Sequence, residues 1–385
     1  MHDRLRLTGL EQLWAVPVGT DEATPPLPAD SPSLWPSPRR ALEQAVLPAL
    51  RRTPCLVSFS GGVDSSVVLA VAAHVARREG LPLPIPATHR FRDVPEADES
   101  RWQEQVIAHL GLDDWLRLEW TDELDVVGPV ATALLERHGV LVPFNGHFQQ
   151  PFVERAAGGA LLTGVGGDEL FAPVRRATAA HVLLRHRHPR RGDLPALAYG
   201  VAPRPLRAAV LARRRPVARY GWIRPEARRR LARAYAAWEV NEPLRWDRAL
   251  RAWWWRSRAL QCNLASKRVL GEAGDVLLVS PLAAPETIAA CAAAGGPVGL
   301  GPRARALGAI AGDLLPAAVL GRTSKASFDG AFWTGRARAF VAAWDGSGVD
   351  PQLVDVPALR AEWTSAQPDP HTFALLQQAW LAVGD

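Results

Sequence analysis

The stretch Cys55-Leu-Val-Ser-Phe-Ser60-Gly61-Gly62-Val63-Asp64-Ser65-Ser66 joins a short apolar run to a second one, Val67–Val71. This order predicts a strand, a tight loop and the N-terminus of a helix. Two glycines let backbone N–H groups approach an anion closely, and the serine hydroxyls add donors beside the positive end of the helix. The loop is therefore typical of a phosphate-binding site.

Asp64 lies inside this loop, where a carboxylate and a phosphate would repel each other. A divalent cation between them removes the conflict, because Mg²⁺ prefers carboxylate and phosphate oxygens. We therefore expect a nucleotide and Mg²⁺ together. The pattern is neither a Walker loop nor a dinucleotide fingerprint. A capping turn built from Ser, Gly and Asp is the structural alternative, and five matched positions in this context disfavour it.

The chain has 385 residues, enough for one large or two ordinary domains. No apolar run reaches the length of a membrane span, and the N-terminal residues lack the layout of a signal peptide. We expect a cytoplasmic protein with no membrane partner. Cys55, Cys262 and Cys291 are few, distant and odd in number, so we expect buried thiols and neither disulfides nor a zinc site.

Arginine supplies nearly all of the positive charge, because Lys267 and Lys325 are the only lysines. Arginine clusters at 185–191, 213–215 and 228–230 could neutralise nucleic-acid phosphates. Arginine on solvated helix faces is the favoured explanation in a chain so rich in Ala and Pro and so poor in Lys. We therefore expect no nucleic-acid partner, and each lysine gains interest from its rarity.

Three segments follow from the composition. Residues 1–38 form an N-terminal segment ending in a Pro-rich extended linker from residue 21. Residues 39–175 should form an α/β core, and residues 176–385 a mostly helical part. The run Trp253–Trp255 favours a role in a core or an interface over a ligand platform, since consecutive residues point to different sides of a helix.

Strands and helices alternate through residues 39–175. Beside the strand of the phosphate loop, strands are predicted at 83–91, 115–120 and 160–163, and helices at 39–52, 96–109 and 126–138. This alternation predicts an α/β fold with a doubly wound parallel sheet, whose ligands bind outside the carboxyl ends of the strands.

Two further segments carry chemistry. Gly164-Val-Gly-Gly-Asp168-Glu-Leu-Phe171 repeats the logic of the first loop, so Asp64 and Asp168 could face one site and share Mg²⁺. The segment Arg322-Thr-Ser-Lys325-Ala-Ser-Phe328-Asp-Gly330 has its lysine among small polar residues, where a loop could bring the ammonium group to a reacting centre.

In this order and spacing, the three segments resemble the synthetase domain of the asparagine synthetase family, an ATP pyrophosphatase of the adenine nucleotide alpha hydrolase type. β-Lactam synthetase and the lasso-peptide macrolactam cyclases are relatives. The likeness runs from about residue 40 to 340. It implies an AMP-forming amide ligase that adenylates a small-molecule or peptide carboxylate with ATP and Mg²⁺ and transfers the acyl group to an amine.

The resemblance also implies roles for individual residues. Lys325 and Arg322 would be catalytic, with Lys325 stabilising developing negative charge. Asp64 and Asp168 would bind Mg²⁺, and Arg303 or Arg305 would replace a second phosphate-binding lysine. The residues near ATP would be Val57, Ser58, Ser60, Gly61, Gly62, Asp64, Ser65, Ser66, Thr163, Gly164 and Gly167.

Departures from the family pattern are equally informative. His2 stands where a glutaminase would have its nucleophilic Cys, and fewer than 60 residues precede the phosphate loop, so we expect no glutaminase domain. Val165 stands where asparagine synthetase has Glu and β-lactam synthetase has Tyr. Ala284 ends a segment that has lost both of its family acids. An acceptor other than that of asparagine synthetase is therefore favoured, with ring closure within one substrate as one form.

Two alternatives stay open. The chain could be a non-catalytic nucleotide-binding protein that presents a substrate to another enzyme, or it could work with a partner protein that delivers substrate. It could also be a tRNA-modifying ATP pyrophosphatase, for which paired catalytic cysteines are missing.

Overall fold

The computed structural model describes residues 5–28, 37–171, 177–184, 188–214, 219–324 and 326–384. Its centre is a five-stranded sheet in which every pairing is parallel. The strands are β1 Cys55–Ser58, β2 Ile85–Phe91, β3 Leu116–Trp120, β4 Ala160–Leu162 and β5 Leu277–Val279. Their order is β3-β2-β1-β4-β5. The predicted doubly wound α/β fold is confirmed.

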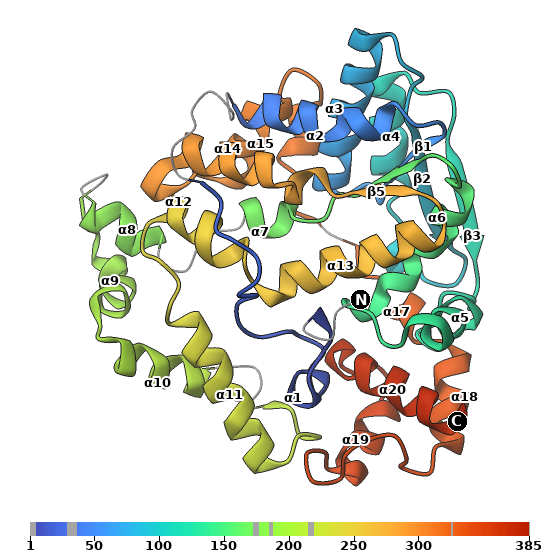
Figure 1. Cartoon of the computed structure of the whole chain (residues 1–385), viewed down its shortest axis with the longest axis vertical. Helices are drawn as coiled ribbons and strands as arrows, with labels where there is room; N and C mark the ends of the chain where they lie inside the picture. The colour runs from blue at the N-terminus through green and yellow to red at the C-terminus, as the bar shows by residue number, and fades with distance from the viewer. Residues whose placement is uncertain are drawn as a thin grey trace.

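Helices cover both faces of this sheet (Figure 1). The helices of the first half are α2 Pro38–Leu50, α3 Val63–Glu79, α4 Ser100–Leu110, α5 Pro129–His138, α6 Gln150–Arg155 and α7 Gly167–Phe171. Neighbouring strand residues point to opposite faces. Val57 and Leu162 therefore join the core under α2 and α3, whereas Leu56 and Leu161 join a second core with residues of α5 and α6. This burial on both faces explains why β1 and β4 are apolar runs.

The order of the strands reverses between β1 and β4. From β1 the chain winds outward through β2 and β3, and it then returns to place β4 and β5 on the other side of β1. Cys55 pairs with Ala160 and Val57 with Leu162, so the two strands end at the same level. Ligands of open α/β sheets bind at such a switch point. The loops that follow β1 and β4 meet there.

The second half is mainly helical, and it completes the molecule around the sheet (Figure 1). Its helices are α8 Ala177–Leu183, α9 Leu194–Val201, α10 Arg204–Arg214, α11 Pro225–Glu239, α12 Trp246–Arg248, α13 Arg258–Ala273, α14 Pro285–Gly295, α15 Arg303–Ala311, α16 Ala317–Leu320, α17 Asp329–Phe332, α18 Gly335–Ala343, α19 Val356–Trp363 and α20 Phe373–Gly384. A π-helical turn, Ala249–Trp254, precedes α13. A separate core gathers Trp363 of α19 and Phe373 of α20 with Trp222, which precedes α11.

The N-terminal segment packs against this second half. It contains one short helix, α1 Gly9–Gln12, capped by Thr8. Leu13 and Trp14 are buried in the core of the C-terminal helices. Glu11, which is buried, forms an ion pair of 2.8 Å with Arg258 at the start of α13. Backbone hydrogen bonds link Gly19 to Arg258 as well. The segment therefore anchors the N-terminus of α13.

Two elements differ from the sequence expectation. β5 comes from the segment expected to be mostly helical, because three residues are too few to show a strand period. Helix α4 begins at Ser100 instead of 96, since Pro95–Ala97 forms a 3₁₀ turn and Asp98 accepts a hydrogen bond from the Ser100 N–H. Among the described residues, no helix is long and apolar enough to cross a membrane.

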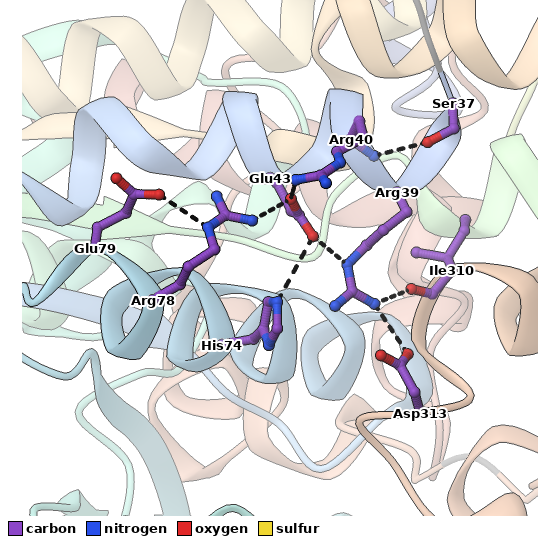
Figure 2. Close-up of polar contacts among 9 residues, drawn as sticks. All are labelled: Ser37, Arg39, Arg40, Glu43, His74, Arg78, Glu79, Ile310 and Asp313. Carbon is purple, nitrogen blue, oxygen red and sulfur yellow. Dashed lines mark hydrogen bonds and ion pairs between the residues drawn. The ribbon is translucent and has the colours of Figure 1, made fainter.

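Helices α2 and α3 are joined by a buried carboxylate, Glu43 (Figure 2). Its oxygens accept hydrogen bonds from Arg39 at 2.7 Å, Arg40 at 3.1 Å and Arg78 at 2.6 Å. Burial raises the pKa of this carboxyl, but the hydrogen bonds from Arg78 and Arg39 outweigh that effect and hold the pKa below its ordinary value. Arg39 also donates to the Ile310 carbonyl at the end of α15. Glu43 thus links α2 to α3, and Arg39 extends the hydrogen-bond network to α15.

The three cysteines are buried thiols, as expected. Burial raises the pKa of Cys55 and of Cys291 to about 12. Of the arginine clusters, residues 228–230 lie on α11, where Arg229 pairs with Glu226. The other two clusters fall partly outside the described residues.

Candidate active site

The loop after β1 has the geometry of an anion site. Gly61 adopts a φ of +86°, which favours glycine, and a Cβ there would lie 2.8 Å from the side chain of Gln103. Helix α3 starts at Gly62 without a side-chain cap, so its first N–H groups stay available. The hydroxyls of Ser65 and Ser66 donate to the Gly62 carbonyl at 3.0 and 2.8 Å.

The loop after β4 lies directly against it. A Cβ on Gly164 would lie 3.0 Å from the backbone nitrogen of Ser65. A Cβ on Gly167 would overlap the Asp64 carboxyl, only 2.2 Å from its Cγ. Glycine at these two positions thus lets the two loops approach without displacing the Ser65 backbone or the Asp64 carboxyl. This close contact places Asp64 beside the start of α7, which carries Asp168.

Arg303 joins the two carboxylates. Its Nη2 lies 2.6 Å from both carboxyl oxygens of Asp64 and 3.6 Å from Asp168 Oδ1. Asp64 and Asp168 thus converge on one cationic group, as the parallel sheet predicted. A cation between two carboxylates at a sheet edge is the charge arrangement that a divalent metal site requires, so this donor set fits Mg²⁺. Among the described residues, no cluster of three or more His, Cys, Asp or Glu side chains offers another metal site.

Arg322 supports the phosphate loop from the other side. Its guanidinium is buried, pairs with the buried carboxylate of Glu99 and donates to the Gly61 carbonyl at 2.9 Å. It also lies over the ring of Trp102, 4.7 Å from the centroid. Arg322 is therefore positioned to hold the loop in shape. Lys325 lies outside the described residues.

The remaining predicted residues divide between surface and interior. Ser58 and Ser60 line a cavity beside the loop, whereas Val57 is fully buried in the sheet. Thr163 is also buried, and its hydroxyl hydrogen-bonds that of Ser280 at 2.8 Å. Arg305 lies on α15 two positions after Arg303.

One cavity adjoins the phosphate loop, and a second cavity adjoins the first. The first, of about 550 Å³, lies between Ser58–Ser60 and residues 326–329, and its wall includes Lys267 of α13. The second, of about 470 Å³, is lined by Trp238, Trp253 and two acids of the α11 end, Glu239 and Glu242. Pro143, Val165 and Asn263 line both, so the cavities adjoin at these residues.

The tryptophan run is divided between these environments. Trp254 and Trp255 pack against the main core, in agreement with the expected core role. Trp253 stacks on Trp238, with centroids 4.6 Å apart, and forms a wall of the second cavity. Because of the π-helical turn at 249–254, Trp253 lies against Trp238, whereas Trp254 and Trp255 lie against the main core.

Gln103 and Lys267 carried no sequence motif, whereas Glu99 belongs to the Ala97-Asp98-Glu99 segment that also fits the family resemblance. Glu99 and Gln103 support the loop from α4 and its start, and Gln103 donates to the Ser60 carbonyl at 3.0 Å. Lys267 lies on the cavity wall. Its rarity in an arginine-rich chain was the one signal in the sequence, because nothing in its neighbours distinguishes it from a helix-surface lysine.

A parallel sheet with glycine loops at its switch point is typical of nucleotide-binding α/β proteins. The comparison with protein families agrees, since the asparagine synthase family matches residues 38–290. The chain belongs to that family, whose members are ATP-dependent amide ligases. A search of curated protein sequences gave no significant match.

Proposed function

We propose that this protein is an AMP-forming ligase that adenylates a carboxylic acid with ATP and passes the acyl group to an amine. The observation that carries the proposal is the convergence of Asp64 and Asp168 on Arg303, beside a glycine loop at the switch point. Family membership supports the use of ATP. Ring closure within one substrate is the finer form that we favour.

The residues divide the work as follows. The N–H groups at the start of α3 and the hydroxyls of Ser60, Ser65 and Ser66 would hold phosphates. Mg²⁺, held by Asp64 and Asp168, would neutralise phosphate charge. Arg303 would then exchange its carboxylate partners for phosphate oxygens, which a guanidinium binds well. Val57, Ser58, Thr163, Gly164 and Gly167 would shape the nucleotide site.

The reaction needs two displacements. A carboxylate oxygen of the substrate attacks the α-phosphorus, an O–P bond forms, and the bond to the β-phosphate bridge breaks to release pyrophosphate. The amine nitrogen then attacks the acyl carbon, a C–N bond forms, AMP leaves with the electrons of the C–O bond, and the nitrogen loses a proton. Lys325 would stabilise the oxyanions of both steps, an effect worth about 100-fold or more in rate.

Pyrophosphate release from ATP, Mg²⁺ and pooled candidate acids tests the proposal. We expect Asp64→Asn and Lys325→Ala each to lower the release about 100-fold or more. Asp114→Asn, which changes an exposed carboxylate before β3, should leave it unchanged. Mass spectrometry distinguishes ring closure, in which one substrate loses water, from an intermolecular amide. Equal release by wild type, Asp64→Asn and Lys325→Ala would refute the site.

A second candidate is a nucleotide-binding partner without catalysis. Val165 favours it, because an apolar side chain lies between the two cavities where relatives carry Glu or Tyr. This candidate predicts Mg²⁺-dependent binding of ATP with no pyrophosphate release across the same acids.

A further inference from the structure

The cavity beside the phosphate loop is unusually aromatic for a site next to phosphates. Its walls include five phenylalanines and a histidine, namely Phe59, His89, Phe148, Phe152, Phe328 and Phe332. His89 stacks on Phe152 with centroids 4.1 Å apart. Burial lowers the pKa of His89 to about 4, and its two ring nitrogens are engaged by Trp120 and the Phe148 carbonyl. The ring is therefore a neutral part of the wall.

Lys267 introduces a charge into this wall. Its side chain is 7% exposed. Among the described residues, no hydrogen-bond acceptor or carboxylate contacts its ammonium group. Burial lowers its pKa to about 8, so most molecules still carry the charge at neutral pH. A buried charge without a partner is costly, and an ionised ligand in the cavity can supply that partner.

The other charges of the site are already engaged. Arg303 is held by Asp64 and Arg322 by Glu99. Asp329, the carboxylate on the wall of this cavity, accepts a hydrogen bond from Ser327 at 3.0 Å. Within the described part of the cavity wall, Lys267 is thus the cation that an incoming anion would meet.

Three amides complete the polar contribution. The side-chain oxygens of Gln103, Gln149 and Asn263 are buried, and none accepts a hydrogen bond from a described residue. Asn263 lies one helical turn before Lys267 on α13, so both side chains reach the same face. Amide oxygens accept hydrogen bonds, so they suit N–H or O–H donors of a ligand, whereas Lys267 supplies the cation for a carboxylate. The cavity therefore suits a carboxylic acid that has an apolar body and also carries donor groups.

We propose that this cavity binds the acid substrate, with the carboxylate on the Lys267 ammonium group and an aromatic or apolar body against the phenylalanines. The inference rests on the proposed function, because adenylation requires an acid next to the phosphate loop. A triphosphate suits most of the cavity less well, because Ser58 and Ser60 lie at one end and much of the rest of the wall is aromatic. The donors for phosphates lie in the loop and at α3.

A pair of probes separates the charge from the shape. Binding of 3-phenylpropionate and of the uncharged 3-phenylpropanamide is titrated by ligand-observed NMR against wild type, Lys267→Met and Arg268→Met. Arg268 is the exposed neighbour on the same helix and removes an equal charge. We expect wild type and Arg268→Met to bind the acid about 10-fold or more tightly than the amide, as a charge-assisted hydrogen bond provides. Lys267→Met should lose this preference.

Two results would overturn the inference. One is wild type that binds neither probe or shows no preference for the acid. The other is Lys267→Met that keeps the preference while its circular dichroism matches wild type. If Lys267→Met does not fold, Lys267→Gln takes its place, because glutamine retains a polar end. The same two results would then overturn the inference.

A nucleotide arm distinguishes this inference from the proposed function. Affinity for the Mg²⁺ complex of α,β-methylene-ATP is measured by calorimetry on the same proteins. We expect Lys267→Met to stay within about twofold of wild type, and Asp64→Asn to lose affinity. A tenfold loss in Lys267→Met would show that the lysine serves a phosphate and would overturn the inference. Wild type that prefers the acid but binds no nucleotide would support the cavity and refute the ligase.

Discussion

Glu43 and Lys267 are both buried charges, but their surroundings are opposite. Glu43 lies between α2 and α3 and accepts hydrogen bonds from three arginines (Figure 2). Lys267 lies on the wall of an aromatic cavity and contacts no acceptor among the described residues. The carboxylate has its pKa held low by its partners, whereas burial alone pushes the pKa of the lysine down. The Glu43 carboxylate stabilises the fold. The buried Lys267 ammonium group lowers stability, and we attribute its presence to the proposed binding of the acid substrate.

Among substitutions of buried charges, Arg322→Ala is expected to lower the free energy of unfolding the most, because it removes one member of the Arg322–Glu99 pair. Removing one member of a buried pair costs about 3–5 kcal/mol, because the other charge is left without a partner. Arg322→Ala strands the Glu99 carboxylate, which is 7% exposed, and removes the support of the Gly61 carbonyl. We expect a fall of that size in the free energy of unfolding, measured by urea denaturation. A loss below about 1 kcal/mol would contradict the pairing.

Lys267→Met should act in the opposite direction. Its pKa falls from 10.5 to about 8, which corresponds to a destabilisation of about 3 kcal/mol. The folded state binds fewer protons than the unfolded state between these values, so the wild type gains stability as pH rises through this window. We expect the variant to be more stable at pH 7 by about that amount, and the difference to shrink towards pH 10.5. Urea midpoints at several pH values measure it, and lower stability of the variant at pH 7 would contradict the absence of a partner.

Glu43→Gln sharpens the same contrast from the other side. The carboxylate stabilises the fold above its ordinary pKa, and this contribution is lost as pH falls through the lowered pKa of the folded state. We expect a loss of about 2 kcal/mol at pH 7, because hydrogen bonds to charged groups disappear. The gap to wild type should close in acid. If the difference in free energy of unfolding between wild type and Glu43→Gln is the same at acidic and at neutral pH, the effect comes from packing and not from charge.

The smallest effect belongs to an exposed pair. Arg92 and Glu119 lie 2.9 Å apart, with side chains 67% and 62% exposed. Water screens such a pair, so Arg92→Ala should change the free energy of unfolding by about 0.5 kcal/mol or less. This variant calibrates the three buried ones. A loss as large as that of Glu43→Gln would show that burial is not what separates them.

The sequence predicted the sheet well because its signals are local. Apolar runs of strand length alternate with helical patterns, and glycine loops mark the strand ends that form the site. The meeting of Asp64 and Asp168 followed from parallel topology alone. β5 escaped prediction because Leu277–Val279 has no room for a period.

Contacts between distant segments were beyond the reach of pattern alone. Arg303 lies 239 positions from Asp64, and only the packing of α15 against α3 brings them together. Lys267 has neighbours typical of any helix surface, and its exposure depends on residues 143–152 and 326–332 folding over it. Burial, which decides whether a lysine is costly, is a property of the folded chain.

The switch point has one more consequence. The loops proposed to hold phosphates come from strand ends β1 and β4, whereas the cavity wall combines residues of β1 and β2 with residues of α13 and of segments that follow the sheet. Under the proposed function, substitutions on the cavity face of α13 would alter which acid is accepted without changing the residues of the phosphate loop. That helix face would then offer protein engineers a place to change selectivity.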